Sequence, residues 1–176
     1  MPFNLDTFKS NFIGGARSYL FKFPPQFPEG VSTVPAAPET KYLVRATNVP
    51  ESTTEEIIVN WQGADYKLAG KQTFTDWTIT FNVDQGAAVR VAYEEWIKAI
   101  HNVDGSHKYG LPVEYEMTQN LWMLNYDGSE HILDIELVDA WPKSVSAITL
   151  DYSAMDVAQF DVTFGYLYHR ITNSSS

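Results

Sequence analysis

The sequence contains no cysteine, so neither a disulfide framework nor a thiolate metal site can form. It also has no continuous apolar run of about 18 residues, the length that a membrane-spanning helix needs. Its first residues lack the basic start and apolar stretch that mark a secretory signal. These absences predict no membrane-spanning segment. The 176 residues are most simply one domain, long enough to enclose a substantial core.

Signatures of catalysis and of metal binding are missing as well. The histidines show no spacing typical of metal ligands, and the sequence has no GxSxG, GxGxxG or Walker-type motif. Carboxylates are abundant, but no pair is singled out as a glycosidase pair would be. We therefore expect no metal, no cofactor and no enzymatic activity.

Basic residues are scarce in the last part of the chain. The net charge is −10, and the segment from Tyr109 to Ser176 carries ten acids but only Lys143 and Arg170 as bases, which makes −8 of that total. Such a surface repels phosphates, which argues against a nucleic-acid binder held by counterion release. From composition alone, the acids could equally serve solubility.

Most of the sequence alternates between polar and apolar residues. This pattern predicts a mainly β fold of antiparallel strands arranged as a barrel or sandwich. Five of the nine prolines fall in residues 24–40, which we interpret as a loop. Asp127-Gly128 indicates a hairpin between two long strands. The expected strands are 16–23, 42–48, 55–62, 65–68, 73–81, 113–124, 129–141, 147–151 and 157–168.

One amphipathic α-helix is predicted over about residues 85–101, flanking the sheet. Its apolar residues recur at helical spacing from Val89 to Ile100, and Asp84 stands where an N-cap is expected. We expect Tyr93, Trp96 and Ile97 to anchor this helix on the sheet. Residues 1–15 form an N-terminal arm in this interpretation, 16–170 the β domain and 171–176 a disordered tail.

Acidic residues share one face of the predicted long strands, opposite an apolar face. The residue pattern alone is compatible with the solvated outer face of an ordinary β-sandwich. The acidic positions are Glu114, Glu116, Asp134, Glu136 and Asp161.

Two blocks of sequence carry a specific pattern. The first block runs from Leu68 to Ile100 and joins an aromatic strand to the predicted helix. The second block contains Trp141-Pro142, Val145, Leu150-Asp151-Tyr152 and Phe160-Asp161-Val162-Thr163. Together the two blocks resemble the tail tube protein family of T4-like contractile bacteriophages, and the resemblance extends from about Arg17 to Tyr168, nearly the whole chain.

The resemblance implies a structural virion protein whose strands complete a multi-subunit ring barrel. The rings of this family are homo-hexamers that stack into a tube, with the five acids facing a lumen through which DNA passes without specific binding. The implied partners are the tail sheath, a tape-measure protein in the lumen, and baseplate and tail terminator proteins. The implied location is the virion tail, assembled in the host cytoplasm. Candidate stacking segments are residues 1–15, 24–40 and 48–56.

Three alternatives remain open from the sequence. A baseplate tube-initiator, or the tube of a phage-like contractile injection system, would share the fold. A monomeric β-sandwich binding module would use Trp61, Trp77 or Trp122 as a stacking platform. An enzyme would show a pocket with perturbed carboxylates.

Overall fold

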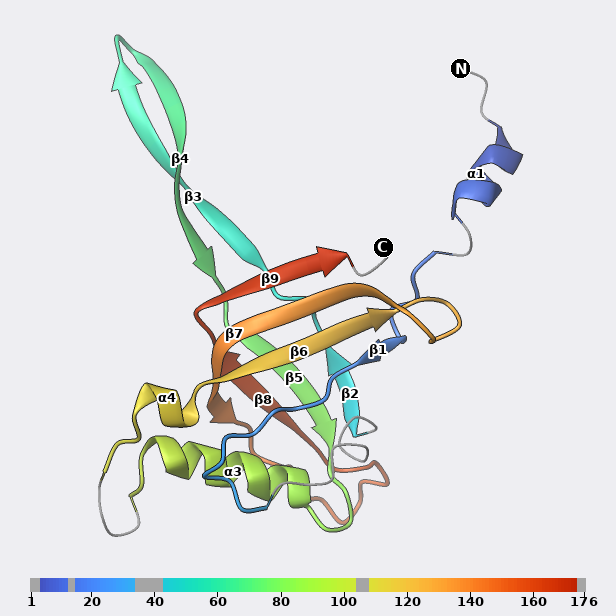
Figure 1. The fold of residues 1–176 in the computed structure, drawn as a ribbon, viewed down its shortest axis with the longest axis vertical. Coiled ribbons are helices and arrows are strands. Elements are labelled where there is room, and N and C mark those ends of the chain that lie inside the picture. The colour runs from blue at the N-terminus through green and yellow to red at the C-terminus, as the bar shows by residue number, and fades with distance from the viewer. Residues whose placement is uncertain (1–3, 13–14, 34–42, 104–107, 174–176) are drawn as a thin grey trace.

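The computed structural model describes residues 4–12, 15–33, 43–103 and 108–173. Strands dominate, all their pairings are antiparallel, and the predicted mainly β fold is confirmed (Figure 1). The elements in chain order are α1 (Leu5–Phe12), β1 (Phe21–Lys22), β2 (Val44–Thr47), β3 (Ser52–Trp61), β4 (Ala64–Phe74), β5 (Trp77–Asn82), α3 (Ala88–Ile100), α4 (Pro112–Tyr115), β6 (Met117–Leu124), β7 (His131–Val145), β8 (Gln159–Gly165) and β9 (Tyr168–Asn173).

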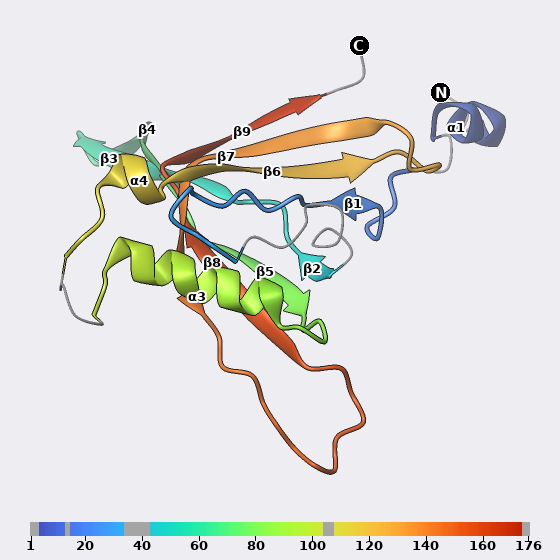
Figure 2. The same cartoon turned by 60° about the horizontal axis from the view of Figure 1, so that its bottom comes forward.

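A single seven-stranded sheet folds back on itself along β7. Residues 133–138 of β7 pair with β9 on one side, and residues 131–140 pair with β6 on the other. Residues 141–145 pair with β8 instead. Asp139 lies between the two parts with φ 52°, a left-handed conformation that turns the strand. We call β1, β6, β9 and the first part of β7 the first layer, and β2, β5, β8 and the end of β7 the second layer (Figure 2).

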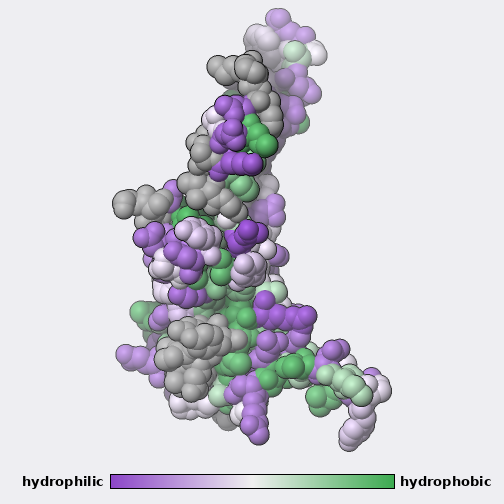
Figure 3. All heavy atoms as spheres, turned by 90° about the vertical axis from the view of Figure 1, so that its right-hand side faces the viewer, coloured by the Kyte–Doolittle hydropathy of each residue, from purple (hydrophilic) through white to green (hydrophobic). Residues whose placement is uncertain are grey.

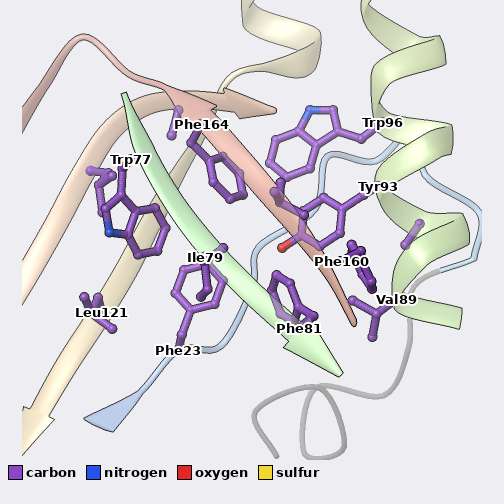
Figure 4. Packing of buried hydrophobic residues seen from close by; sticks show 14 of the residues in the cluster. Phe23, Trp77, Ile79, Phe81, Val89, Tyr93, Trp96, Leu121, Phe160 and Phe164 are labelled. Atoms are coloured by element: carbon purple, nitrogen blue, oxygen red, sulfur yellow. The ribbon is translucent and has the colours of Figure 1, made fainter. Parts of the chain in front are cut away.

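The core between the layers is built from aromatic rings, because the alternating strands turn one apolar set inward. In β5, Trp77, Ile79 and Phe81 are buried while the residues between them are not. Phe164 of β8 packs edge-on against Trp96 and Phe23, with ring centroids 6.1 and 6.5 Å apart (Figure 4). Edge-to-face ring pairs at such distances add stability beyond their buried area.

Helix α3 closes this core, as its apolar stripe predicts. Tyr93 and Trp96 are fully buried, and the Trp96 indole N–H donates to the carbonyl of Tyr115 at 2.7 Å. Burial raises the pKa of the Tyr93 hydroxyl well above its ordinary value. Ile97 is half-buried and lies outside the core cluster, so two of the three predicted anchors carry the packing.

The start of α3 differs from the prediction. The N-cap residue is Ala87, held at φ 51°, and not Asp84. The Asp84 carboxylate still accepts a bond from the Ala88 N–H at 3.3 Å, so it supplies the capping oxygen from one turn earlier.

The segment after β1 is fastened by side chains, because Pro24 and Pro25 cannot donate to a ladder. The fully buried Gln119 amide donates to the carbonyl of Gln26 at 2.8 Å and accepts from its N–H at 3.0 Å. These two hydrogen bonds from the Gln119 side chain take the place of the backbone bonds that a strand would make at Gln26. The described part of the 24–40 loop therefore lies against β6.

A carboxylate ties the far end of this segment to α3. Glu95 accepts bonds from the N–H groups of Ser32 and Thr33, each at 2.9 Å, and from both hydroxyls. The Thr33 N–H contributes most to lowering the pKa of Glu95, because a carboxylate that accepts several bonds is stabilised in its charged form.

Several predicted boundaries are wrong. Residues 113–116 are not strand, because Pro112 starts the short helix α4, in which Glu114 accepts a bond from the Leu111 N–H at 2.9 Å. Residues 147–151 belong to an irregular loop. The predicted tail is strand as far as Asn173, which pairs with Leu133, and residues 174–176 lie outside the described part. Among the described helices, none is both long and apolar enough to cross a bilayer.

Candidate assembly interface

The first layer ends in two strands that offer hydrogen-bonding groups to a partner. Strand β9 pairs with β7 alone among the described residues, and β1 pairs with β6 through only two residues. A free edge strand is a template for pairing with another chain, and monomeric proteins normally shield it. These edges are therefore candidates for subunit contact.

The order of the strands fits lateral repetition of the chain. From β1 through β6 and β7 to β9 each pairing is antiparallel, so β1 and β9 run in opposite directions. A second copy placed with its β1 beside β9 therefore continues the antiparallel pattern without a break.

A long hairpin, β3–β4, projects from the body (Figure 1). Its strands have ten and eleven residues, and nearly every residue is exposed. The exposed large apolar side chains on it are Ile57, Ile58, Val59, Trp61, Tyr66 and Leu68. Figure 3 shows hydrophobic and hydrophilic residues side by side on another face of the molecule. An isolated two-stranded hairpin is marginal in water, so this one is suited to burial against a partner.

The hairpin is fixed to the body at its base. Phe74 packs against the rings of Tyr166 and His169, with centroid distances of 6.1 and 5.1 Å. Burial lowers the pKa of His169. The direction in which the hairpin leaves the body is thus set by packing, while its outer part is free to contact another molecule.

The structure brings together only two of the five predicted lumen acids. Asp134 and Glu136 lie on the outer face of the first layer, because their neighbour Ile135 points into the core. Glu136 pairs with Arg170 of β9 at 3.4 Å, and Asp134 lies 3.1 Å from His131. The Arg170 guanidinium also stacks over the Tyr168 ring at 5.2 Å.

The other three predicted acids lie elsewhere. Asp161 is on the outer face of the second layer, where its carboxylate accepts from Thr80 at 2.7 Å. The two layers enclose one core, so this face points away from Asp134 and Glu136. Glu114 lies in α4 and Glu116 at its C-cap, so the expectation of one continuous strand face is wrong for both.

The outer face of the first layer is also less acidic than the sequence suggested. Lys22 sits beside Trp122 on this face, and Arg170 lies beside Glu136. These two bases balance the two acids. Sequence analysis missed this because it treated Arg170 as the end of the domain, whereas residues 168–173 form a strand of the same layer.

The tryptophans do not form the stacking platform of a binding module. Trp77 is only 2% exposed and belongs to the core, whereas Trp61 is 70% exposed near the hairpin tip. Trp122 is half-buried and stacks on His131 at 4.7 Å. The three rings therefore lie in separate environments.

Among the described residues, sheet edges with few pairing partners, a projecting apolar hairpin and a polar face of balanced charge are the features expected of structural subunits that associate with copies of themselves. The chain belongs to the phage tail tube protein family, whose model matches residues 20–172. The sequence-based prediction of a tail tube protein of contractile phage tails, a component of the virion tail, is confirmed.

Individual relatives agree with this assignment. The chain is 27% identical to tail tube protein gp19 of Enterobacteria phage T4 over 128 residues, which cover 72% of this chain and 78% of that protein. It shares its fold with a chain of the PVC sheath–tube complex of an extracellular contractile injection system, at a TM-score of 0.67 and 14% identity over 98% and 99% of the two chains. It is also similar to a chain of the six-fold symmetrised baseplate of the anti-feeding prophage, at a TM-score of 0.60 and 14% identity over 89% and 93%.

Proposed function

We propose that this chain forms closed hexameric rings by pairing β9 of one copy with β1 of the next, and that the rings stack into the tube of a contractile tail. The alternating strand order of the first layer carries the proposal, since each added copy extends the same antiparallel barrel. Closure removes both free edges. The ring size is supported by the resemblance to T4-like tubes and by the six-fold baseplate that contains a similar chain.

The first layer is the better candidate for the wall of the lumen. Its outer face is formed by four strands, whereas residues 146–158 overhang the outer face of the second layer and form a hollow with it. A conduit wall has to be free of projections. In this arrangement Asp134 and Glu136 point into the lumen.

The lumen wall would let DNA slide because it has few bases and because Arg170, one of the two on this face, already has partners nearby. Glu136 and the Tyr168 hydroxyl both engage Arg170, which reduces its attraction for a passing phosphate. DNA binding that depends on counterion release needs several available cations, and this face offers few. Passage without specific binding follows. The proposed role is mechanical and involves no catalysis.

The remaining partners follow from the tube architecture. A sheath would surround the tube, as the similar chain of the PVC complex is described together with a sheath. A tape-measure protein would occupy the lumen before DNA does. Baseplate and terminator proteins would close the two ends, and assembly would take place in the host cytoplasm.

Negative-stain electron microscopy of the purified chain over a range of concentrations tests this proposal. We expect rings with six-fold symmetry in end views, and tubes at high concentration. A chain that remains monomeric at every concentration would contradict it. A variant with Ile171→Pro, which blocks the N–H of a β9 edge residue, should reduce ring formation, whereas the same change at the exposed loop residue Leu150 should leave rings intact.

A further inference from the structure

The base of the β3–β4 hairpin packs on a histidine. His169 lies opposite Leu137 in the pairing of β9 with β7, and Leu137 is fully buried, so the imidazole is on the inner side of the first layer. Phe74, the last residue of β4, meets the imidazole at 75° with the ring centroids 5.1 Å apart. Tyr166, between β8 and β9, packs on it at 5.9 Å. We call Phe74, Tyr166 and His169 the base cluster.

The base cluster contains two buried polar atoms without partners. In the described part of the chain, neither the Nδ1 of His169 nor the hydroxyl of Tyr166 has a hydrogen-bond partner. A buried polar atom that lacks a partner costs stability, and the cost is much larger when the group carries a charge. The cluster therefore suits a neutral imidazole better than an imidazolium.

The charged groups around the base cluster do not compensate a proton on the imidazole. On the hairpin base and on β7 they are Glu51, Lys71, Asp76, Asp139 and Lys143. Asp76 is already engaged by Lys143 at 2.6 Å. Glu136 and Arg170 pair with each other on the opposite face of the first layer. Burial and, after it, the charge of Asp76 raise the pKa of the Tyr166 hydroxyl, which therefore stays neutral.

The packing of the hairpin base depends on pH in a definite direction. Burial lowers the pKa of His169 from its ordinary value of 6.5, because the charged form would lose water without gaining a partner. An imidazole that has left the cluster therefore takes up a proton at a higher pH than a packed one. The packed state is favoured most above about pH 6.5, and it weakens as the pH falls through that value toward the lowered one.

Beyond its base the hairpin has little contact with the body. All ten residues of β3 are exposed, and in β4 only Gly70, Thr73 and Phe74 are partly buried. A strand of ten residues is about 30 Å long, so a small movement at the base becomes a large one at the tip (Figure 1). The base cluster therefore controls the direction in which the exposed apolar side chains of the hairpin are presented.

We propose that His169 is a pH-sensitive joint: its neutral ring holds the base of the β3–β4 hairpin on the body, and protonation in mild acid releases the hairpin. At neutral pH the hairpin then points in one direction, prepared for a partner. In acid it samples many directions, and any contact that it makes has to bear the cost of ordering it. The joint belongs to the single chain and does not require ring formation.

Spin labels on two introduced cysteines test the joint, because the chain has no cysteine of its own. Asn60→Cys places one label near the hairpin tip and Val91→Cys places the other on α3, both at exposed positions. Pulsed electron resonance then measures the distances between the labels in dilute, unassembled protein at about pH 8 and about pH 5, the range in which an imidazole titrates. Ordinary carboxylates stay charged at both values. We expect a narrow distance distribution at the higher pH and a broad one at the lower.

Two further changes in the labelled chain isolate the role of the proton. His169→Phe keeps a flat ring in the base cluster but cannot be protonated, so its distribution should stay narrow at both pH values. The matched control, His101→Phe, replaces a histidine that stacks on Tyr109 after α3, and it should broaden in acid as the parent does. In the parent, the ratio of packed to released hairpin should fall about tenfold for each pH unit that separates the midpoints of the packed and the released imidazole.

Broadening that persists in His169→Phe would assign the release to another group and overturn the inference. A parent distribution that stays unchanged or narrows in acid would mean that the rings hold the imidazolium, and this too would overturn it. If His169→Phe does not fold, nuclear magnetic resonance titration of His169 in the otherwise unmodified chain decides. A midpoint below 6.5 supports the joint, and a midpoint at or above that value overturns it. These measurements use unassembled protein, so their failure leaves the proposed function to be judged by electron microscopy.

Discussion

Phe164 is the residue on which the aromatic core depends most. Its ring packs against Trp77, Tyr93 and Trp96, with centroid distances between 5.6 and 6.1 Å, and it joins the second layer to α3. The rings around Phe164 belong to β5 and α3, so they cannot easily move together to fill the cavity that loss of the Phe164 ring would leave.

Phe164→Ala should therefore lower the free energy of unfolding by about 3–5 kcal/mol, the usual cost of removing a buried phenylalanine ring. Urea unfolding of dilute, unassembled protein measures it. The control Leu150→Ala, at an exposed position, should change stability by less than about 0.5 kcal/mol. A loss below about 1 kcal/mol for Phe164→Ala would contradict the central position of this ring.

Glu95 makes stability depend on pH in a definite direction. The Thr33 and Ser32 bonds lower its pKa in the folded state, so the folded chain holds the charged form more strongly than the unfolded chain does. The stabilisation is present above the ordinary pKa of a glutamate and is lost as the pH falls through the lowered folded value.

Glu95→Gln should accordingly be less stable than the unmodified chain at neutral pH, and the difference should shrink at acidic pH. Thermal unfolding at several pH values measures this difference. The control is Glu29→Gln, an exposed acid outside this cluster. A difference that stays constant down to strongly acidic pH would show that the bonds do not depend on the carboxylate charge.

Among the elements, α3 shows what a sequence can predict. Its stripe from Val89 to Ile100 fits one period, and the buried side of the observed helix is that stripe. Helix α4 escaped prediction because alternation continues through residues 113–116, whereas Pro112 and the Glu114 cap favour a helical turn locally. Local capping outweighed the periodic pattern there.

The shared face expected for the five candidate lumen acids was only partly predictable for a related reason. Period-two alternation identifies which residues of a strand share a face, and it did so for Asp134 and Glu136. It does not say which layer a strand joins. Asp161 was grouped with them although β8 belongs to the second layer, and the bend at Asp139 that separates the layers has no glycine to signal it.

The β3–β4 hairpin should serve assembly and not folding. Replacing Trp61 and Tyr66 together by serine removes two exposed rings near its tip, so the stability of the unassembled chain should change by less than about 0.5 kcal/mol. Tube formation should be lost or strongly reduced, as electron microscopy would show. Normal tubes from this variant would assign the stacking contact to another element.

At the scale of the whole molecule, the role of charge on the proposed lumen face can be tested by charge reversal. Asp134→Lys with Glu136→Lys replaces two negative charges by two positive ones, which raises the net charge of each subunit by four units, and the change would be repeated around each proposed ring. Phosphates would then be attracted to the wall, and DNA ejection from particles that carry the variant should slow.

The matched control is Glu114→Lys with Glu116→Lys, which changes charge equally in and beside α4. It should leave ejection unchanged. Equal slowing by both variants would mean that total charge matters and not the lumen face. Unchanged ejection in both would remove the electrostatic role of Asp134 and Glu136, and other residues would then have to form the wall.

The course of β7 through both layers has a mechanical consequence. One unbroken length of backbone belongs first to the proposed inner wall and then to the outer layer, with its bend at Asp139. An axial force on the outer layer of such a tube is therefore transmitted to the inner wall through the covalent backbone of β7, and not only through side-chain packing. A tube built in this way should resist sliding of its outer layer along its inner wall.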